Sequence, residues 1–301
     1  MQFNSKIKTT YKIPPKLAEY NKDLNAIGID LGTSECCAFV IRRNGPEGVV
    51  LDSVTNQRNM PSYVAMNELN LPCGQNVVNR MVTKPEYSTF DAKFLMGMEL
   101  EEIVIDPLWP FGVISYCEEI YITFGNKRFP PWIRNSVDIS SCLLRHIKTK
   151  AEEFQGIRLE EAVITVPSSF TEKQKDATID AATNNLKWRL VKLLPEPIAA
   201  LFAYSYETEI PNESTVFLFD CGGGTTDICI AKIIGNKIDI LSEKGDPLFG
   251  GKNFDRVLIS YFNSVLNHKY GLNVLETNKK YRLMVKCQEI KHTLSVQTDA
   301  K

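Results

Sequence analysis

The chain has 301 residues, a length that predicts about two domains. Its 44% apolar and 24% charged residues are typical of a soluble globular protein, and its net charge of -1 argues against a surface that binds nucleic acid. Eight cysteines without a C-x-x-C pair, with only three histidines, exclude the usual zinc-site spacings and a disulfide framework. No apolar run reaches the ~18 residues of a membrane span, so we expect a cytoplasmic protein in a reducing compartment.

The predicted elements follow in chain order. Residues 1–23 are lysine-rich and interrupted by Pro14-Pro15, which predicts a flexible N-terminal extension. The segment AIGIDLGTSECCAFVI (26–41) predicts a β-hairpin with a D-x-G-T turn. Further on, LEEAVITVP predicts a strand that ends at Pro167, and a capping box at Thr171 begins a helix. Because strands and helices alternate, the fold class is α/β.

An internal repeat links two distant parts of the chain. The segment VFLFDCGGGTTDICIAKI (216–233) repeats the order of the first hairpin: apolar strand, Asp, spacer, glycine-containing turn, Thr and a second apolar strand. The two copies centre on Asp30 and Asp220. Their similarity predicts two related lobes, each of which offers one loop to a ligand between them.

The chemistry of these loops indicates phosphate binding. Glycine lets backbone N–H groups approach an anion closely, and threonine hydroxyls add donors. An Asp beside a phosphate is favourable only if a divalent cation lies between them. Asp30 to Thr33 alone could equally be an ordinary turn, but the triple glycine at 222–224 exceeds what a simple hairpin needs. Neither loop matches the Walker or Rossmann glycine pattern.

With these residues in place, the chain from about Asn25 onward resembles the nucleotide-binding domain of the seventy-kilodalton heat-shock chaperones. The motifs that carry the resemblance are IGIDLGTS (27–34), PSYVA (61–65), FDAKFLMG (90–97), WPF (109–111), VITVPSSF (163–170), LLPEPIAALFAY (193–204), FDCGGGTTD (219–227) and LFGGKNFD (248–255). Actin and sugar kinases share the implied fold, but FDAK, WPF and the GG-x-x-FD segment are typical of the chaperones.

The resemblance implies the actin-like ATPase (ribonuclease H-like) fold, with two lobes around a nucleotide cleft. Lobe I would span residues 24–208 and lobe II would begin with residues 209–301. The sequence stops at Lys301, before the remaining part of lobe II and the peptide-binding domain that the family carries. We therefore expect an incomplete second lobe and no peptide-binding domain in this chain.

The resemblance also implies ATP or ADP with Mg²⁺ as ligands. Asp30 and Asp220 would hold Mg²⁺ through water. Lys93 would approach the γ-phosphate and help to place the attacking water, and Glu196, Thr225 and Asp227 would complete the catalytic group. The residues expected to bind the nucleotide are Gly32, Thr33, Ser34, Gly222, Gly223, Gly224, Thr225, Gly250, Gly251, Gln288, Lys291, His292 and Ser295.

Several of these residues have a purely structural alternative. Lys93 could be a surface lysine, and Glu196 could act only on the dipole of a helix N-terminus. Pro167 could simply end a strand rather than act as a switch. The adjacent Cys36 and Cys37 are expected to be buried small residues rather than a redox pair.

The sequence departs from the family in two places. Lys175 stands where members usually have Arg, which weakens any relay that depends on bidentate contacts. Gln288 and His292 replace the usual Glu and Arg on the adenosine side, whereas Lys291 and Ser295 are retained. His292 could still stack on adenine but lacks a permanent charge, so nucleotide affinity could be reduced.

The predicted function is that of an ATP-binding, slowly hydrolysing chaperone ATPase domain with a role in protein folding and the stress response. The resemblance implies a J-domain co-chaperone and a nucleotide exchange factor as partners. One alternative is a non-catalytic module that binds nucleotide or a co-chaperone and regulates full-length relatives. A sugar kinase on the same fold is a third hypothesis, which FDAK and WPF disfavour.

Overall fold

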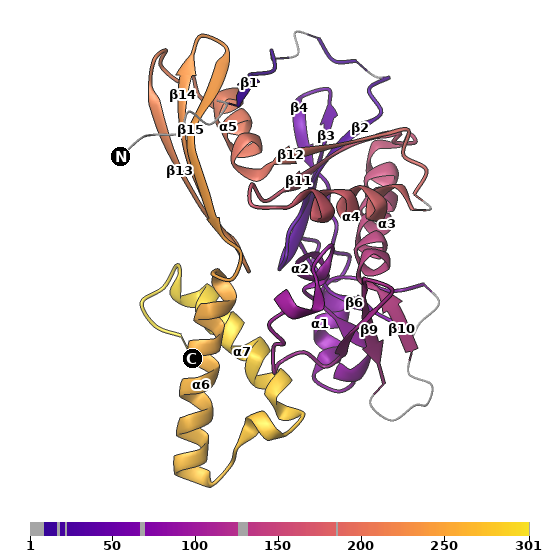
Figure 1. The fold of residues 1–301 in the computed structure, drawn as a ribbon, viewed down its shortest axis with the longest axis vertical. Coiled ribbons are helices and arrows are strands. Elements are labelled where there is room, and N and C mark those ends of the chain that lie inside the picture. Colours follow the sequence, from indigo (N-terminus) through magenta and orange to yellow (C-terminus); the bar gives the residue numbers. More distant parts are fainter. Residues whose placement is uncertain are drawn as a thin grey trace.

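The computed structural model describes residues 9–16, 19–21, 23–66, 70–125, 132–184 and 186–300. Its largest sheet has six strands (Figure 1). Their order is β12 (Leu190–Pro195), β11 (Glu161–Val166), β2 (Ala26–Leu31), β3 (Glu35–Arg42) and β4 (Gly45–Gly48), with β5 (Met60–Pro61) also paired to β3. The expected hairpin is confirmed, since β2 and β3 are antiparallel with Asp30 opposite Cys37. Alternate residues of β2 are buried, as the period of two in its sequence requires.

Two helices beside this sheet begin and end at residues that explain their limits. Helix α3 (Ser136–Gln155) is capped by the Asn135 side chain and ends at Gly156, which has a φ of 76°. Helix α4 (Glu172–Thr183) begins with the predicted capping box at Thr171. Strand β11 ends at Val166, immediately before Pro167, as expected.

The remaining elements of the first half of the chain are short. They are α1 (Gln75–Met81), α2 (Ala92–Leu95), the two-stranded sheet of β6 (Val64–Ala65) and β7 (Ser88–Thr89), the three-stranded sheet of β8 (Gly112–Tyr116), β9 (Glu119–Phe124) and β10 (Trp132–Asn135), and single 3-10 turns at Pro85–Tyr87 and Leu100–Glu102.

A second, antiparallel sheet is formed by the second half of the chain. It contains β13 (Thr215–Cys221), β14 (Thr226–Ile234) and β15 (Lys237–Asp246), so the second copy of the repeat is also a hairpin. Helix α5 (Glu196–Glu207) packs Ile198 and Leu201 into an apolar cluster on this sheet. In Figure 1, α5 lies between the two sheets.

Helices α6 (Gly251–Tyr270) and α7 (Lys279–Leu294) follow, joined through a 3-10 turn at Val274–Glu276. Ile259 of α6 and Tyr281, Met284 and Cys287 of α7 belong to the same apolar core as the first sheet. The core of the first half therefore continues into the last two helices, whereas β13–β15 form a separate cluster. The division into lobes at residue 208 stays a prediction.

The described part of the N-terminal segment includes a strand, which the expectation of a flexible extension did not contain. Residues 1–8, 17, 18 and 22 lie outside the described residues, but β1 (Thr10–Lys12) pairs antiparallel with the start of β15. Tyr11 and Ile13 pack against the second apolar cluster. Burial of Tyr11 at the sheet edge supplies the free energy that composition alone did not indicate.

All eight cysteines are free thiols, with Cys36 buried and Cys37 half-buried. Burial raises the pKa of Cys36 to about 12 and that of Cys37 to about 11, so both remain protonated near neutral pH. This agrees with their expected role as small packed residues. Within the described ranges, no helix combines the length and the apolar character that crossing a bilayer requires.

Candidate functional site

The two glycine-containing turns lie against each other. A Cβ atom built on Gly223 would lie 2.6 Å from Cβ of Ser34, and one on Gly224 would lie 3.1 Å from Cγ2 of Thr33. The side chains of the first turn thus occupy the space above the backbone of the second. Two hairpins 190 residues apart in sequence bring their turns to one place, as the repeat predicted.

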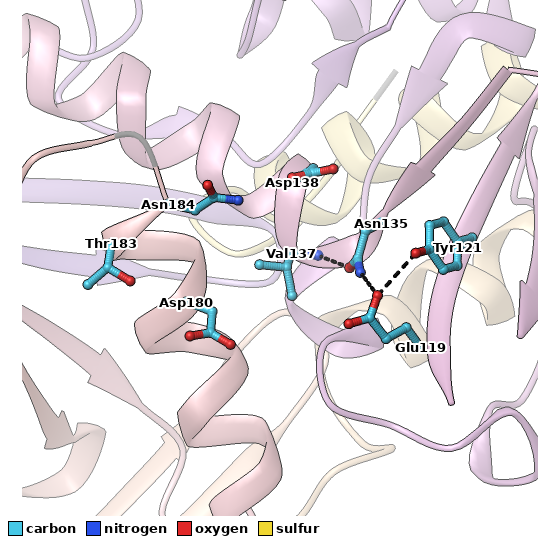
Figure 2. A pocket seen from close by; sticks show the side chains of 8 residues that line it. All are labelled: Glu119, Tyr121, Asn135, Val137, Asp138, Asp180, Thr183 and Asn184. Carbon is cyan, nitrogen blue, oxygen red and sulfur yellow. Dashed lines mark hydrogen bonds between the residues drawn. The ribbon is translucent and has the colours of Figure 1, made fainter. Parts of the chain in front are cut away.

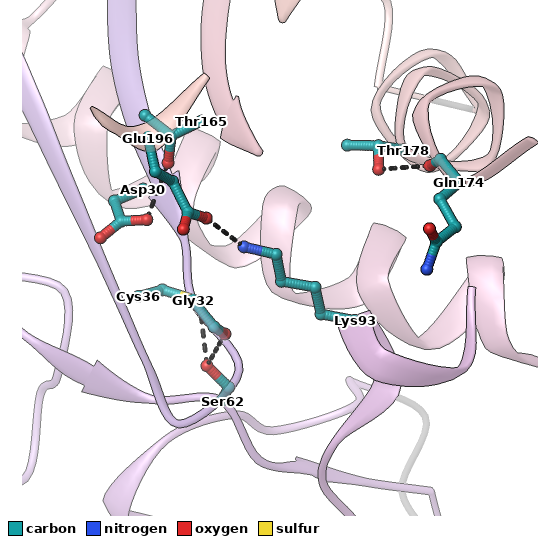
Figure 3. Close-up of polar contacts among 9 residues, drawn as sticks. All are labelled: Asp30, Gly32, Cys36, Ser62, Lys93, Thr165, Gln174, Thr178 and Glu196. Atoms are coloured by element: carbon teal, nitrogen blue, oxygen red, sulfur yellow. Dashed lines mark hydrogen bonds and ion pairs between the residues drawn. The ribbon is translucent and has the colours of Figure 1, made fainter. Parts of the chain in front are cut away.

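The first turn is held from outside by Ser62 in the PSYVA segment. Its hydroxyl donates to the carbonyl oxygen of Gly32 at 2.7 Å, and its backbone N–H donates to Ser34 O at 2.8 Å. Both bonds fix the backbone of residues 32–34, and Figure 3 shows the bond from the Ser62 hydroxyl to Gly32. Backbone N–H groups fixed in this way can be presented to an anion without further ordering cost.

The second turn is held by the start of α6. Gly251 N–H donates to Gly222 O and Lys252 N–H donates to Gly223 O, each at 2.9 Å. Gly250 packs so closely that an added Cβ would lie 2.7 Å from Gly222 O. The predicted Gly250-Gly251 pair therefore lies directly on the triple-glycine turn, where a larger residue would not fit.

Lys93 forms the central ion pair of the site. Its Nζ lies 2.7 Å from Oε1 of Glu196, and the two side chains are 7% and 16% exposed. Lys93 is therefore not a surface lysine, and Glu196, the first residue of α5, has a role beyond the helix dipole. Asp30, at the end of β2, accepts a hydrogen bond from Thr165 Oγ1 at 2.8 Å (Figure 3).

Negative charge exceeds positive charge around Lys93. Burial raises the pKa of Glu196, and Lys93 opposes this shift. Burial and the Asp30 charge raise the pKa of Asp220. Burial, with the charges of Glu196 and Asp220, raises the pKa of Asp227 to about 6. Four carboxylates around one lysine create a potential that attracts a cation.

The donor set fits a hydrated divalent cation. Oδ1 of Asp227 is buried and has no hydrogen-bond partner among the described residues, so it offers a free acceptor. Carboxylate oxygens are the ligands that Mg²⁺ prefers, and Mg²⁺ usually keeps several of its waters. In the described part of the chain, no three histidine, cysteine or carboxylate side chains are close enough to ligate a metal directly. Contact through water, as expected for Asp30 and Asp220, is compatible with this geometry.

The residues expected on the adenosine side are only partly joined to the turns. Lys291 Nζ donates to Gly251 O at 3.2 Å and to Asp255 Oδ2 at 2.9 Å. Gln288 hydrogen-bonds Tyr63, whose pKa burial raises to about 12. His292 is exposed, and the Ser295 hydroxyl bonds Lys291 O within its own helix end. Among the described contacts of these four residues, only that of Lys291 leads to a glycine turn, and it does so through Gly251, whose N–H donates to Gly222 O.

Sequence reasoning missed several residues of the site. Ser62, Thr165 and Asp91 lie in quoted motifs, but nothing local to them signals a contact. Asp91 accepts a hydrogen bond from Trp109 Nε1 at 2.9 Å, which joins FDAK to WPF. Lys252, in GGKNFD, forms an ion pair with Asp91.

A separate hollow of about 540 Å³ lies on another part of the surface (Figure 2). Its lining is mainly polar and comes from β9, β10, α3 and α4. The residues are Glu119, Tyr121, Asn135, Val137, Asp138, Asp180, Thr183 and Asn184. None of the predicted site residues contributes to it.

Comparisons with known proteins identify one family. A family model described as "Hsp70 protein" matches residues 26–301. The chain is 32% identical over 289 residues to heat shock cognate 70 kDa protein 3 of Dictyostelium discoideum, covering 92% of this chain and 45% of that protein. It is also 32% identical to a heat shock 70 kDa protein of Emericella nidulans, covering 90% of this chain and 42% of the relative. A human relative, putative heat shock 70 kDa protein 7, is 32% identical over 91% of this chain and 75% of its own length. The chain thus spans less than half of the first two relatives.

Proposed function

The chain belongs to the Hsp70 family, and from that membership we propose that it is a nucleotide-binding domain that binds ATP or ADP with Mg²⁺ and hydrolyses ATP. The family has the actin-like ATPase fold, and the mixed sheets and helices seen here agree with it. We propose further that residues 24–208 form lobe I of this domain and that residues 209–301 form part of lobe II.

The observation that supports it best is the Lys93–Glu196 ion pair. In addition to burial, the charges of Asp30 and Asp220 raise the pKa of Glu196, and the charges of Glu196 and Asp220 raise that of Asp227, so the carboxylates lie close together around the pair. A lysine placed among carboxylates at the ends of two hairpins is suited to a polyphosphate with its cation. An unrelated salt bridge would not need this excess of negative charge.

The chemistry assigned to these residues is in-line transfer of the γ-phosphoryl group to water. When bound, Mg²⁺ supplies charge neutralisation between the phosphates and the carboxylates. Lys93 neutralises charge on the transferred group, and Glu196 holds the Lys93 amine in place. Asp227 or Glu196 orients the attacking water and accepts its proton. The backbone N–H groups of 222–224 and 32–34 bind the phosphates.

The second candidate is a module that binds nucleotide without turning it over. It is favoured by the contact between the two glycine turns and by Lys291, which is bound to Asp255 and Gly251 O. In this candidate, the two turns must separate for the nucleotide to bind and then close on it. Repeated turnover by the purified chain would exclude this candidate.

Calorimetric titration of the chain with ATP and Mg²⁺ tests the proposal. Asp220→Ala removes a cation-holding carboxylate, so we expect its affinity for Mg-ATP to fall at least about 10-fold. Asp176→Asn removes an exposed carboxylate of α4 and is the matched control, which should bind like the parent. Absence of binding by the parent chain contradicts the proposal.

Co-chaperone partners are expected for a member of this family. We infer that a J-domain protein and a nucleotide exchange factor are among them. A cytoplasmic location is likewise part of the proposal, supported by eight free thiols, which persist in a reducing compartment. Pull-down with purified co-chaperones and cell fractionation test these two points.

A further inference from the structure

Lys252 contacts both halves of the candidate site. Its backbone N–H donates to Gly223 O at 2.9 Å, which holds the triple-glycine turn. Its side chain forms an ion pair with Asp91, which lies just before α2. The two side chains are 20% and 6% exposed, so the pair is largely shielded from water. One residue therefore touches the second turn through its backbone and the FDAK segment through its amine.

Asp91 determines the position of the helix that carries Lys93. It is the N-cap of α2 and has a φ of 66°, a left-handed conformation that is uncommon for residues other than glycine. Two groups hold it: Trp109 Nε1 at 2.9 Å, and Lys252. Phe94 N–H donates to Asp91 O at 2.9 Å, so the helix begins from this residue. Lys93 then reaches Glu196 from the first turn of α2.

The charges around Lys252 make the Asp91 contact important. Burial and the neighbouring cations Arg256 and Lys291 lower the pKa of Lys252 to about 7, and Asp255 opposes them. Contact with the Asp91 carboxylate favours the charged amine. Without Asp91, the amine would lose the carboxylate through which it contacts the FDAK segment.

We propose that Lys252 is a positioning residue that couples the triple-glycine turn to the helix bearing Lys93. The inference rests on the proposed function, because it assigns Lys252 a role in placing Lys93 for ATP hydrolysis. Lys252 is not itself a catalytic residue, since its amine contacts Asp91 rather than the reacting group. Movement of the second turn during nucleotide binding is transmitted to Lys93 through this ion pair.

A neighbouring contact provides the matched control. Arg256, one turn further along α6, pairs with Asp106 Oδ2 at 2.7 Å. It joins the same helix to the same half of the protein, but it contacts neither Asp91 nor the glycine turn in the described structure. A general weakening of the packing of α6 would therefore appear in Arg256→Met as well as in Lys252→Met.

The first readout is hydrogen exchange of the nucleotide-free protein. Lys252→Met should raise exchange of the Phe94 and Met96 amides, which are bonded within α2, about 10-fold. Asp91→Asn, which removes the charge of the other partner in the ion pair, should raise exchange of the same amides. Lys252→Arg should keep their exchange close to that of the parent, and Arg256→Met should leave it unchanged. Unchanged exchange in both Lys252→Met and Asp91→Asn overturns the proposal, as does an equal rise in Arg256→Met.

The second readout is single-turnover hydrolysis at saturating ATP. Lys252→Met should slow it about 10- to 100-fold, because misplacement of Lys93 affects the chemical step, and Lys252→Arg should recover most of the rate. Parent-like rates in Lys252→Met contradict the coupling. If the parent does not hydrolyse ATP, the proposed function fails, and hydrogen exchange alone decides whether Lys252 holds α2.

Discussion

Lys93 is bound to a partner 103 residues further along the chain, and both side chains are nearly buried. The proposed chemistry assigns it the neutralisation of charge on the transferred phosphoryl group. Lys93→Ala should therefore lower single-turnover ATP hydrolysis about 100-fold. Phosphate release from the purified variants measures this. Lys279→Ala, at an exposed position on α7, is the control; equal rates in parent and Lys93→Ala rule out the assigned role.

Asp227 makes stability depend on pH. Its pKa is raised to about 6 in the folded protein, mainly by burial. Between about pH 4 and pH 6 the folded state holds a proton that the unfolded state has lost, so this group's contribution to stability decreases as pH rises. Above pH 6 the charged Asp227 is destabilising.

Asp227→Asn removes this penalty and should stabilise the protein at pH 7.5 by roughly 1 to 3 kcal/mol, with little gain at pH 4. Urea unfolding at both pH values provides the measurement. Asp176→Asn should show no such pH-dependent difference. A variant less stable than the parent at pH 7.5 would show that the charged Asp227 does not destabilise the folded protein. The same variant should bind Mg-ATP more weakly, because one carboxylate charge is lost.

At the scale of elements, the triple-glycine turn is shaped by what packs on it. Gly223→Ala would place a Cβ atom 2.6 Å from Cβ of Ser34, closer than two carbons can lie, so the turns must move apart. We expect a fall in unfolding free energy of about 1 to 3 kcal/mol and weaker nucleotide binding. Gly28→Ala is the control, since its nearest neighbour would be 3.9 Å away. Thermal unfolding that is unaltered in Gly223→Ala contradicts the contact.

The N-terminal strand covers the edge of the second sheet. Thr10 Oγ1 donates to Asp239 Oδ1 at 2.7 Å, and Ile13 N–H donates to Asn236 O at 2.8 Å. Removal of residues 1–16 would uncover this edge and take Tyr11 from the apolar cluster. We expect a lower thermal midpoint, by several degrees, and more aggregation on heating. Removal of residues 1–8 alone should have little effect, and an equal loss in both truncated proteins would contradict the assigned role of the strand.

For the whole molecule, the contact between the two glycine turns leads to a prediction about nucleotide entry. The proposed function places the phosphates between the turns, which are in contact here, so it requires an opening step before binding. Observed association rates of a fluorescent ATP analogue should therefore reach a plateau as its concentration rises. Stopped-flow measurements test this. A rate that increases linearly over the whole accessible range would show that the turns do not limit entry.

Packing of α6 and α7 bears on that opening. Their buried residues share one core with the first sheet, and Lys280 Nζ donates to Pro107 O at 2.6 Å. The second sheet has its own small cluster and a face with exposed Phe217 and Phe219. Relative movement is therefore easier at β13–β15 than at the last two helices, because less apolar surface has to be uncovered there.

The sequence by itself determined the local features of this protein. The two hairpins, the end of β11 before Pro167 and the capping box at Thr171 depend on residues close together in the chain, so their patterns sufficed to predict them. The repeat around Asp30 and Asp220 also predicted that two turns would meet. The described part of the N-terminal segment differs from its prediction, because Tyr11 pairs with Ile238, a residue more than 200 positions further along the chain.

Only the tertiary structure decided which charges meet. The Lys93–Glu196 and Lys252–Asp91 pairs join residues that are more than 100 positions apart, and strand order, register and helix packing place them. Short-range propensity carries no information about such distances. The excess of carboxylates around Lys93, and the second connection to α2 through Lys252, follow from the way in which the two sheets and α6 pack together.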